Sequence, residues 1–457
     1  MPGGDAITTQ ATADLLAEVQ ALIHERERDG VLGMAELIGP AEWADLVPQL
    51  EPSEVAVLIQ WLPDEEIAAI LEELPPHSAA SILRSLSANE AGLLLGEMDP
   101  DDAADVVELL PDEAAAEILV RMKPEDAAEL RALSGYDPES AGGIMTPEYV
   151  AVSKDATSAQ AIAAIRRLVD EAETVNYVYV VDEERHLLGV LSLYRLLLSV
   201  DTTPVERLMA PSTVRVRAST DQETAARILT DRNLLAIPVV DDDDHLIGII
   251  TEDDVADVLQ AEATEDIERL GGSQPLNLPY RLASVPLLVR KRVGWLMLLF
   301  IAQGYTGTVL RNFEGELAAV VALSFFIPLL IGTGGNVGSQ TVTLVVRAMA
   351  LGEVAMRDIG WLVFKELRVG LVMGLVMGVA AIGQAWFLNV SSDIATAVSI
   401  SVIAICVWAA TVAAALPLIL RRAGVDPAVV SAPLISTLVD GTGLIIYFEI
   451  ARAVLRL

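Results

Sequence analysis

The charge of this chain is divided so unevenly that its two parts must fold in different surroundings. Residues 1–285 contain 56 Asp and Glu against 18 Lys and Arg, a net charge of −38, whereas residues 286–457 contain 9 against 12, a net of +3. Long apolar stretches occur in the second part. We therefore expect an acidic soluble part and a membrane part. Nucleic acid and anionic surfaces would be repelled by the soluble part, which favours cations as its partners.

The second part contains five apolar stretches that could span a bilayer. They lie near Gly294–Leu310, Leu317–Val346, Gly370–Leu388, Ala395–Leu420 and Val429–Val454. The second and the last exceed the ~20 residues that a span requires, which predicts tilt or interruption. With the N-terminus inside, nearly all basic residues near the spans fall on the inner side, and the C-terminus lies outside. The first ten residues, MPGGDAITTQ, do not resemble a signal peptide, so we expect the soluble part in the cytoplasm.

Asp440 is the one carboxylate in the central part of the last apolar stretch, beside Gly441-Thr442-Gly443. A charge at the centre of a membrane helix costs about 2.5–3.5 kcal/mol even on lenient scales, so it is retained where it faces an interior, a partner or an ion path. A buried aspartate paired with arginine is the alternative. No base lies between Val429 and Tyr447 to pair with it, which favours an ion path.

The first 130 residues carry a repeat of Leu-Pro or a near equivalent. It recurs every 11 to 13 residues, at Glu51-Pro52, Leu62-Pro63, Leu74-Pro75, Leu86-Ser87, Asp99-Pro100, Leu110-Pro111 and Lys123-Pro124. Proline suits the first turn of a helix, and each copy continues with small and large apolar residues. The pattern predicts an all-α superhelical solenoid of two-turn helices.

Residues 138–262 contain two copies of an α/β unit that resembles a tandem CBS pair. The first copy contains Val178–Asp182 and Gly189–Ser192. The second copy contains the corresponding segments Ile237–Asp241 and Gly248–Thr251. CBS pairs commonly sense adenine nucleotides or metal ions, and the resemblance implies a ribose-binding aspartate three residues after the Ser or Thr. The second copy has it, as Thr251 and Asp254, whereas the first has Arg195. ATP binding as a modulator is left open at one site.

Taken in order, these parts resemble the MgtE family of magnesium channels over essentially the whole chain. The resemblance also rests on AGGIMTPEYVAV at 141–152, AEATEDI at 261–267, GTGGNVGSQ at 332–340 and DPAVVSAPLISTLVDGTGL at 426–444. It implies a homodimer with five transmembrane helices per subunit around a shared pore. The expected domains are an acidic helical N domain at 1–135, CBS domains at 136–200 and 201–262, a connecting, plug-type helix at 263–285, and the transmembrane domain at 286–457.

In the pore, the resemblance places Mg²⁺ near Asp440, with Asp426 contributing at the start of the same span. Mg²⁺ gives up its waters reluctantly, so two Asp440 side chains could hold a largely hydrated ion. Ser436 lies one turn before Asp440, and Asn336 is the polar residue of GTGGNVGSQ that we expect nearest the ion. Asp426-Pro427 equally fits an N-cap followed by proline. Ser339 and Ala432 depart from the residues usual in the family, which leaves selectivity open.

The resemblance also implies a cytosolic Mg²⁺ sensor. Its expected ligands are Asp101, Asp105, Gly143, Asp221, Glu223, Asp254, Asp257, Glu262, Glu265 and Asp266. The alternative is a solvated acidic face, the usual fate of such runs.

We therefore expect a Mg²⁺ channel of the inner membrane that mediates uptake and closes when cytosolic Mg²⁺ occupies the sensor. A secondary transporter that exchanges Mg²⁺, or another divalent cation such as Co²⁺, for Na⁺ or H⁺ is the alternative. The absence of Cys and His ligands disfavours soft metals. There is no GxxxxGK[ST] loop, no HExxH and no Cys/His cluster, so we expect no enzymatic activity.

Overall fold

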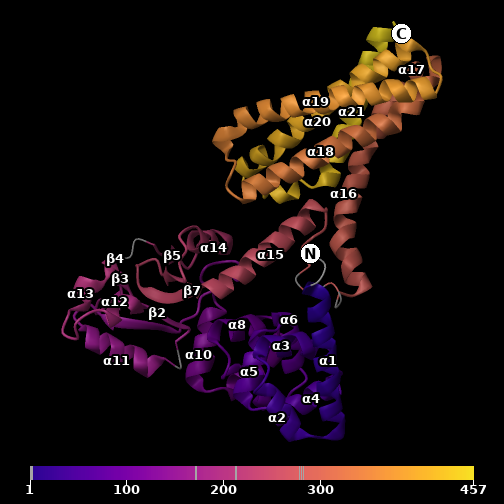
Figure 1. Cartoon of the computed structure of the whole chain (residues 1–457). Helices are drawn as coiled ribbons and strands as arrows, with labels where there is room; N and C mark the ends of the chain where they lie inside the picture. Colours follow the sequence, from indigo (N-terminus) through magenta and orange to yellow (C-terminus); the bar gives the residue numbers. More distant parts are fainter. Residues whose placement is uncertain are drawn as a thin grey trace. The chain divides into compact units, whose positions relative to one another are not determined.

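The computed structural model describes residues 4–169, 172–211, 214–276, 278, 280 and 283–456. The chain divides into two compact units, Met1–Gln260 and Ala261–Leu457, which are described separately below. Figure 1 shows the first unit as short helices followed by strands, and the second as long helices.

Short helices fill the first part of the first unit. They are α1 (Gly4–Glu25), α2 (Arg28–Ala35), α3 (Pro40–Leu46), α4 (Pro52–Trp61), α5 (Asp64–Glu72), α6 (Pro76–Leu83), α7 (Ala88–Leu95), α8 (Pro100–Glu108), α9 (Asp112–Arg121) and α10 (Pro124–Leu133). The repeated proline marks their starts in two ways. Pro52, Pro100 and Pro124 are the first helical residues of α4, α8 and α10, whereas Pro63 and Pro111 are the N-caps of α5 and α9.

Every second helix of this series packs together: α3 on α5, α5 on α7, α7 on α9, and α6 on α8 on α10. Helices of two to three turns cannot bury an apolar face alone, and stacking gives them a shared core. That core contains Trp43, Leu83 and Leu95, each about 1% exposed.

The two α/β copies each form a small sheet. In the first, β1 (Tyr149–Ser153), β2 (Thr174–Val181), β3 (Leu187–Ser192) and β4 (Ala210–Pro211) lie in the order β1-β2-β3-β4, with helices α11 (Ser158–Leu168), α12 (Leu193–Leu197) and α13 (Val205–Leu208). In the second, β5 (Val216–Arg217), β6 (Ala236–Val240) and β7 (Leu246–Thr251) form the order β5-β6-β7, with α14 (Gln222–Asp231). Each sheet begins with a parallel pair and continues with an antiparallel one, so the predicted duplication is present.

The second copy shares its core with the helical stack, because Val216, Ala225 and Ile237 belong to the same buried cluster as the residues of α3–α10. The first copy has a core of its own, and Tyr179 packs with Val240 and Ile249 between the copies. Acidic residues of α8 lie close to Asp254, which follows β7 by three residues.

Helix α15 (Glu252–Leu270) starts directly after β7. It ends at Gly271-Gly272, where Gly272 has a φ of +76°. The expected helix over 263–285 therefore differs from the structure. The helical part belongs to α15 and stops at Leu270, because Gly272 takes a left-handed conformation that favours glycine. The described residues between 271 and 284 are not helical, and Asn277, Pro279, Arg281 and Leu282 lie outside the described residues.

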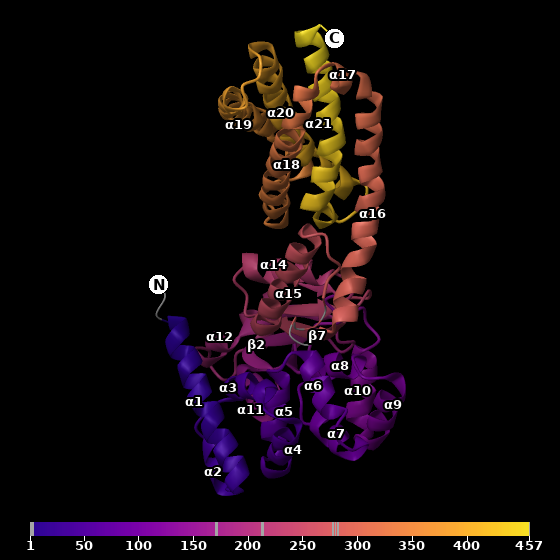
Figure 2. The same ribbon diagram turned by 90° about the vertical axis from the view of Figure 1, so that its right-hand side faces the viewer.

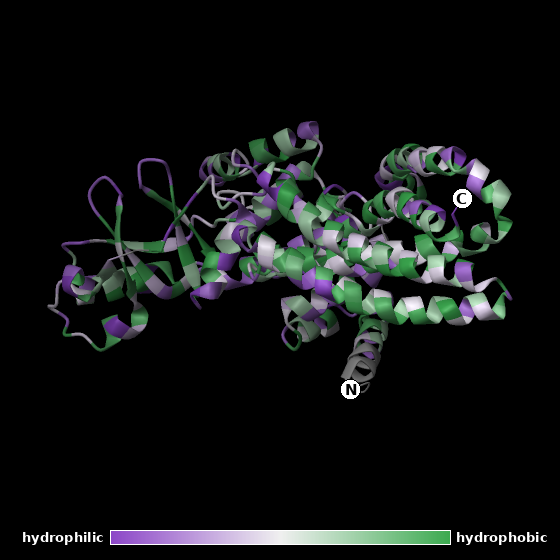
Figure 3. Ribbon diagram, turned by 90° about the horizontal axis from the view of Figure 1, so that it is seen from above, coloured by the Kyte–Doolittle hydropathy of each residue, from purple (hydrophilic) through white to green (hydrophobic). Residues whose placement is uncertain are grey.

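The second unit is built from long helices: α16 (Val285–Asn312), α17 (Glu314–Ala319), α18 (Ile327–Ala350), α19 (Ile359–Phe387), α20 (Ser392–Arg422) and α21 (Ala432–Leu455). Helices α18, α20 and α21 pack on one another, α19 packs on α20, and α16 on α21 (Figures 1 and 2). Figure 3 shows hydrophobic residues along most of the length of the helices near the C-terminus. The core between them includes Phe326, Tyr447 and Phe448, all fully buried.

Among the described residues, four helical segments are long and apolar enough to cross a membrane: Val321–Ala350, Met356–Phe387, Ser392–Arg422 and Ala432–Leu455. They correspond to four of the five expected spans, and the span expected near Gly294–Leu310 lies within α16. The expected second span is interrupted. Val320 leaves the helical conformation, and a 3₁₀ turn over Val321–Phe326 precedes α18.

The glycine-rich segment GTGGNVGSQ forms part of one continuous helix, α18. A Cβ on Gly334 would lie 2.7 Å from Ile405 and one on Gly338 would lie 2.5 Å from Ile435, whereas Gly332 has nothing within 4 Å. Glycines in a membrane helix can either break the helix or let another helix approach closely, and here Gly334 and Gly338 allow close helix packing.

Candidate functional site

Acidic side chains from three places converge within the first unit. Asp99 is the N-cap of α8, Asp101, Asp102 and Asp105 lie within α8, Glu173 precedes β2, and Asp253 and Asp254 lie in the first turn of α15. We call these seven residues the acidic cluster. Pro100 is the first residue of α8, so Asp101 and Asp102 lie in its first turn, and α15 follows β7 directly, so Asp253 and Asp254 lie in the first turn of α15.

Burial and neighbouring charges raise the pKa values of five members of the acidic cluster, Asp101, Asp102, Asp105, Glu173 and Asp254. Burial first, and the charge of Asp254 second, raise the pKa of Asp102 to about 8. Burial and the neighbouring acids raise the pKa of Glu173 to about 8 and that of Asp105 to about 7. For Asp254, burial outweighs its hydrogen bonds with Thr251 and raises the pKa to about 6.

Asp101 is the least satisfied member of the acidic cluster. Burial and the charge of Asp254 raise its pKa well above the usual range, and its Oδ1 atom is buried with no hydrogen-bond partner among the described residues. A carboxylate oxygen in this state requires a proton or a cation to offset its desolvation. Hard divalent cations prefer carboxylate oxygens, so the donor set suits Mg²⁺ or Ca²⁺.

Of the other expected sensor residues of this unit, Gly143, Asp221 and Glu223 lie outside the acidic cluster, whereas Asp257 adjoins it. Asp221 is the N-cap of α14 and accepts a hydrogen bond from the Thr224 N–H at 2.9 Å, and Glu223 pairs with Arg227. Gly143 lies in the turn after α10, where Ser140 forms a β-bridge with Asp221. The structure thus brings Gly143 and Asp221 into one neighbourhood. Asp257 is exposed one turn beyond Asp254 on α15.

Thr251 and Asp254, the expected ribose-binding pair, bond to each other. The Thr251 hydroxyl donates to Asp254 Oδ2 at 2.8 Å, and the Thr251 N–H donates to the same atom at 3.2 Å. Asp254 therefore caps the start of α15 and belongs to the acidic cluster at the same time.

In the second unit, Asp440 lies partly buried on α21, and its Oδ2 atom is 3.5 Å from Nε2 of Gln303 on α16. Ser436, one turn earlier, faces α18. Its hydroxyl lies 3.4 Å from that of Ser339, which also donates to the Ala432 carbonyl at 3.4 Å. The two positions that depart from the family pattern, Ser339 and Ala432, are thus in direct contact.

Asn336 lies on the exposed side of α18, together with Gly332 and Gln340. Within the part of the chain that the structure describes, Asn336 has no hydrogen bond or ion pair, and the hydrogen bond of Asp440 is with Gln303. The expectation that Asn336 lies close to the ion stays a prediction.

Asp426 combines two roles near the start of α21. It accepts a hydrogen bond from the Ala428 N–H at 2.8 Å, as an N-cap does, and it pairs with Arg269 from the last turn of α15. Arg269 also pairs with Glu265. Glu262 and Asp266 lie on the same segment of α15 and belong to this second unit.

Several of these residues could not be selected from the sequence. Asp102 could have been predicted because it adjoins Asp101. No motif or spacing in the sequence indicates a role for Glu173, Gln303 or Arg269. Their roles arise from contacts between residues about 70 to 160 positions apart.

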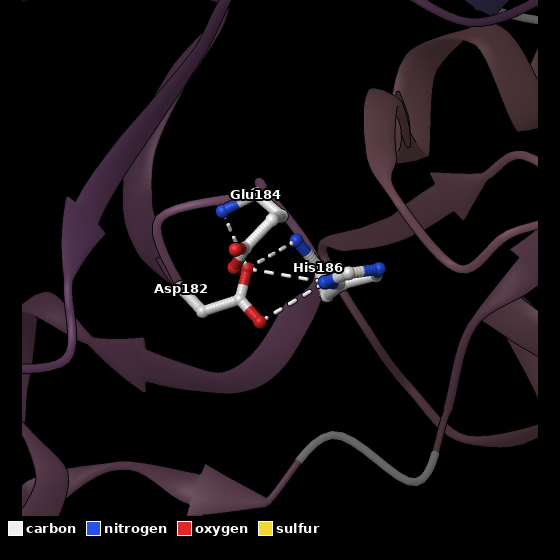
Figure 4. A group of neighbouring side chains, drawn as sticks. All are labelled: Asp182, Glu184 and His186. Atoms are coloured by element: carbon white, nitrogen blue, oxygen red, sulfur yellow. Dashed lines mark hydrogen bonds and ion pairs between the residues drawn. The ribbon is translucent and has the colours of Figure 1, made fainter.

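A further group, Asp182, Glu184 and His186, lies at the turn between β2 and β3 (Figure 4). Asp182 accepts hydrogen bonds from the N–H groups of Glu184 and His186 at 3.1 and 2.8 Å. Asp241 and His245 repeat this pattern in the second copy, and the two imidazole rings stack with centroids 4.5 Å apart. The repetition favours a turn that joins the copies over an ion site.

Comparisons with known proteins agree with this organisation. The family model described as "Divalent cation transporter" (MgtE) matches residues 327–450, the MgtE intracellular N domain matches 38–139, and the CBS domain matches 141–201 and 205–261. The magnesium transporter MgtE of Thermus thermophilus is 44% identical over 328 residues, which are 72% of this chain and 73% of that protein. The magnesium transporter MgtE of Enterococcus faecalis is 34% identical over 331 residues, 72% of each chain.

Two solved structures resemble the soluble part. The crystal structure of the soluble part of a magnesium transporter is 30% identical, with a TM-score of 0.53, and covers 55% of this chain and 99% of its own. The crystal structure of the cytosolic domain of the Mg²⁺ channel MgtE in complex with ATP is 36% identical, with a TM-score of 0.51, and covers 53% of this chain and 99% of its own.

Proposed function

Because the chain belongs to the MgtE family of divalent cation transporters, we propose that its helical unit conducts Mg²⁺ across a membrane as a channel. The observation that carries this proposal is the Asp440 carboxylate in the candidate span α21. Its hydrogen-bond partner among the described residues is the neutral Gln303 amide, not a base. A carboxylate within a span is costly, and a passing cation offsets that cost.

We propose that two copies of the chain form the path, with α16 as a fifth span in each. One Asp440 from each copy gives a charge of −2, enough to attract a hydrated Mg²⁺ without replacing its whole water shell. Asn336 and Gln340, on the exposed side of α18, are polar groups available to the ion's waters. Basic residues in the last turns of α18 and α20 support an orientation in which these two helix ends face the cytoplasm.

The acidic cluster supports a second part of the proposal, closure by cytosolic Mg²⁺. Its carboxylates resist ionisation together, so a divalent cation between α8 and α15 stabilises one arrangement of these elements. A ligand shifts a conformational equilibrium by its differential affinity for the two states. Mg²⁺ that binds the closed state more tightly therefore limits its own uptake.

The test is the reversal potential of the purified full chain in liposomes. A channel gives a potential that follows the Mg²⁺ gradient alone, whereas a transporter that exchanges Mg²⁺ for Na⁺ or H⁺ gives one that moves with those gradients. The same assay with Co²⁺ measures selectivity.

Asp440→Ala should abolish the Mg²⁺ flux, and Asp440→Asn should retain a small part because it keeps an oxygen ligand. Glu449→Ala is the matched control, since Glu449 lies on α21 but pairs with Arg452 at 3.1 Å. Normal flux through Asp440→Ala would contradict the pore assignment.

ATP is a proposed modulator at Thr251 and Asp254, supported by the ATP complex of the related cytosolic domain. Asp254 serves the acidic cluster as well, so ATP and Mg²⁺ binding should influence each other. Asp254→Asn should weaken both, and unchanged ATP binding in this variant would place the nucleotide elsewhere.

A further inference from the structure

Helix α19 carries two cations on a face that no other part of the described chain covers. Lys365 and Arg368 are three residues apart and therefore point to the same side. Both are exposed, and neither forms an ion pair or hydrogen bond with any residue that the structure describes. The acid next to them, Glu366, faces α18 instead, where it accepts a hydrogen bond from Thr341 at 3.5 Å.

Aromatic rings hold both cations in place. The Lys365 ammonium lies 5.0 Å from the centre of the Trp361 ring, and the Arg368 guanidinium lies 5.8 Å from that of Phe364. A hollow of about 470 Å³ lies beside them, lined by Lys365, Arg368, Val369, Val372 and Met373. One side of this hollow is thus cationic and the other apolar.

The length of α19 sets the depth of this hollow in a bilayer. The helix has 29 residues, which at ~1.5 Å per residue exceeds the ~30 Å apolar core by about nine residues. Residues 369–387 contain no charged residue and suffice to cross the core. Lys365 and Arg368 therefore lie at the headgroup boundary, with Trp361 beside them and with Trp386 and Phe387 at the opposite boundary, as aromatic belts do.

Below the two cations, the same face of α19 is exposed and apolar. Val372, Val376 and Val379 are 62%, 65% and 71% exposed. Acyl chains suit this face, and the charges above it suit a phosphate. An anionic phospholipid offers both groups in one molecule.

We propose that the hollow at Lys365 and Arg368 binds an anionic glycerophospholipid from the leaflet at the start of α19. The headgroup phosphate pairs with the two cations, and the acyl chains lie along Val372 and Met373. The proposal requires that α19 spans the bilayer and is independent of what the protein conducts.

The test is native mass spectrometry of the detergent-purified full chain, titrated with equal amounts of phosphatidylglycerol and phosphatidylcholine that have the same acyl chains. The intact protein should bind phosphatidylglycerol preferentially. Lys365→Gln/Arg368→Gln should weaken that binding by about fivefold for each charge and about 25-fold for both. Phosphatidylcholine binding should not change. The matched control is Arg421→Gln/Arg422→Gln, which removes the same charge from the last turn of α20, at the same end of the helices.

A second pair of variants keeps both charges. Val372→Trp fills the hollow and should lower phosphatidylglycerol binding, whereas Val379→Trp adds the same ring to the same face beyond the hollow and should not. Equal losses in the two charge variants would mean long-range attraction and would overturn the proposal. Unchanged binding in Lys365→Gln/Arg368→Gln would do so as well. Loss of dimers without loss of lipid would assign the hollow to a second copy of the chain instead.

Discussion

Asp102 and Asp440 are carboxylates that form no ion pair within the described part of the chain, yet their surroundings differ. Asp440 lies on an apolar helix beside an amide, so one cation can neutralise it. Asp102 lies among other acids, and its ionisation opposes theirs. Asp440 can be recognised in the sequence because its neighbours are apolar. Asp102 and Glu173 cannot, because acids are common in the first 285 residues and only the fold brings these two side chains together.

The acidic cluster predicts an unusual dependence of stability on pH when divalent cations are absent. The folded pKa values of Asp102, Asp105 and Glu173, about 7 to 8, exceed the usual values of 3.8 and 4.5. Groups raised in this way stabilise the fold below their unfolded pKa, and the stabilisation is lost as pH rises through the folded pKa. In EDTA, hydrogen-exchange protection of α8 should therefore fall between pH 6 and pH 8.5.

Asp102→Asn should reduce this fall and raise the protection of α8 at pH 8.5 by about 1–2 kcal/mol. The effect is modest because solvent screens the charge of a partly buried side chain. Glu117→Gln on α9 is the control, since Glu117 is exposed and outside the acidic cluster. If both variants follow the wild-type pH profile, the neighbouring carboxylates do not raise the pKa of Asp102 and the prediction is wrong.

Among the elements, the short helices were the most predictable. Each copy of the repeat supplies a proline or serine at the helix start, and the structure has α4 to α10 at those places. The end of α15 was not predicted. In the sequence, Gly271-Gly272 is compatible both with a helix end and with a flexible point within a longer connecting segment. The interruption at Val320 was expected from the length of the stretch, although its position depends on packing around Leu323 and Phe326.

The close packing of α18 predicts opposite effects for two glycines of one segment. Gly338→Ala places a methyl group 2.5 Å from Ile435 Cγ2, and such overpacking costs about 1–3 kcal/mol. Gly332→Ala meets nothing within 4 Å and gains up to about 1 kcal/mol of helix propensity. Thermal unfolding of the detergent-solubilised chain should show a lower midpoint for Gly338→Ala and an equal or higher one for Gly332→Ala. Equal midpoints would mean that Ile435 moves aside without cost.

At the scale of the whole molecule, the sequence indicated the order of its parts and the family, because charge, repeats and motifs change where the parts change. It could not supply the contacts that join them. Arg269 with Asp426, and α8 with the first turn of α15, connect residues about 150 positions apart.

Closure by Mg²⁺ predicts that the segment at 255–285 changes its accessibility. Added Mg²⁺ at millimolar concentration should protect this segment of the full chain from protease, and EDTA should remove the protection. Deleting residues 1–130, or replacing Asp254, Asp257, Glu262 and Glu265 together by their amides, should leave a conducting protein that no longer closes at high internal Mg²⁺. Identical digestion with Mg²⁺ and with EDTA would mean that the acids are merely solvated.

The raised pKa values of Asp102, Asp105 and Glu173 predict that Mg²⁺ binding in the acidic cluster is coupled to proton release. The raised pKa values of Asp102, Asp105 and Glu173 favour retained protons near pH 7, and metal ligands must be deprotonated. Mg²⁺ binding in the acidic cluster should therefore release protons. The heat of Mg²⁺ binding should then vary with the ionisation enthalpy of the buffer, as titration in phosphate and in Tris would show. Under the proposed closure by Mg²⁺, acidification of the cytosol should therefore raise the Mg²⁺ concentration at which transport stops.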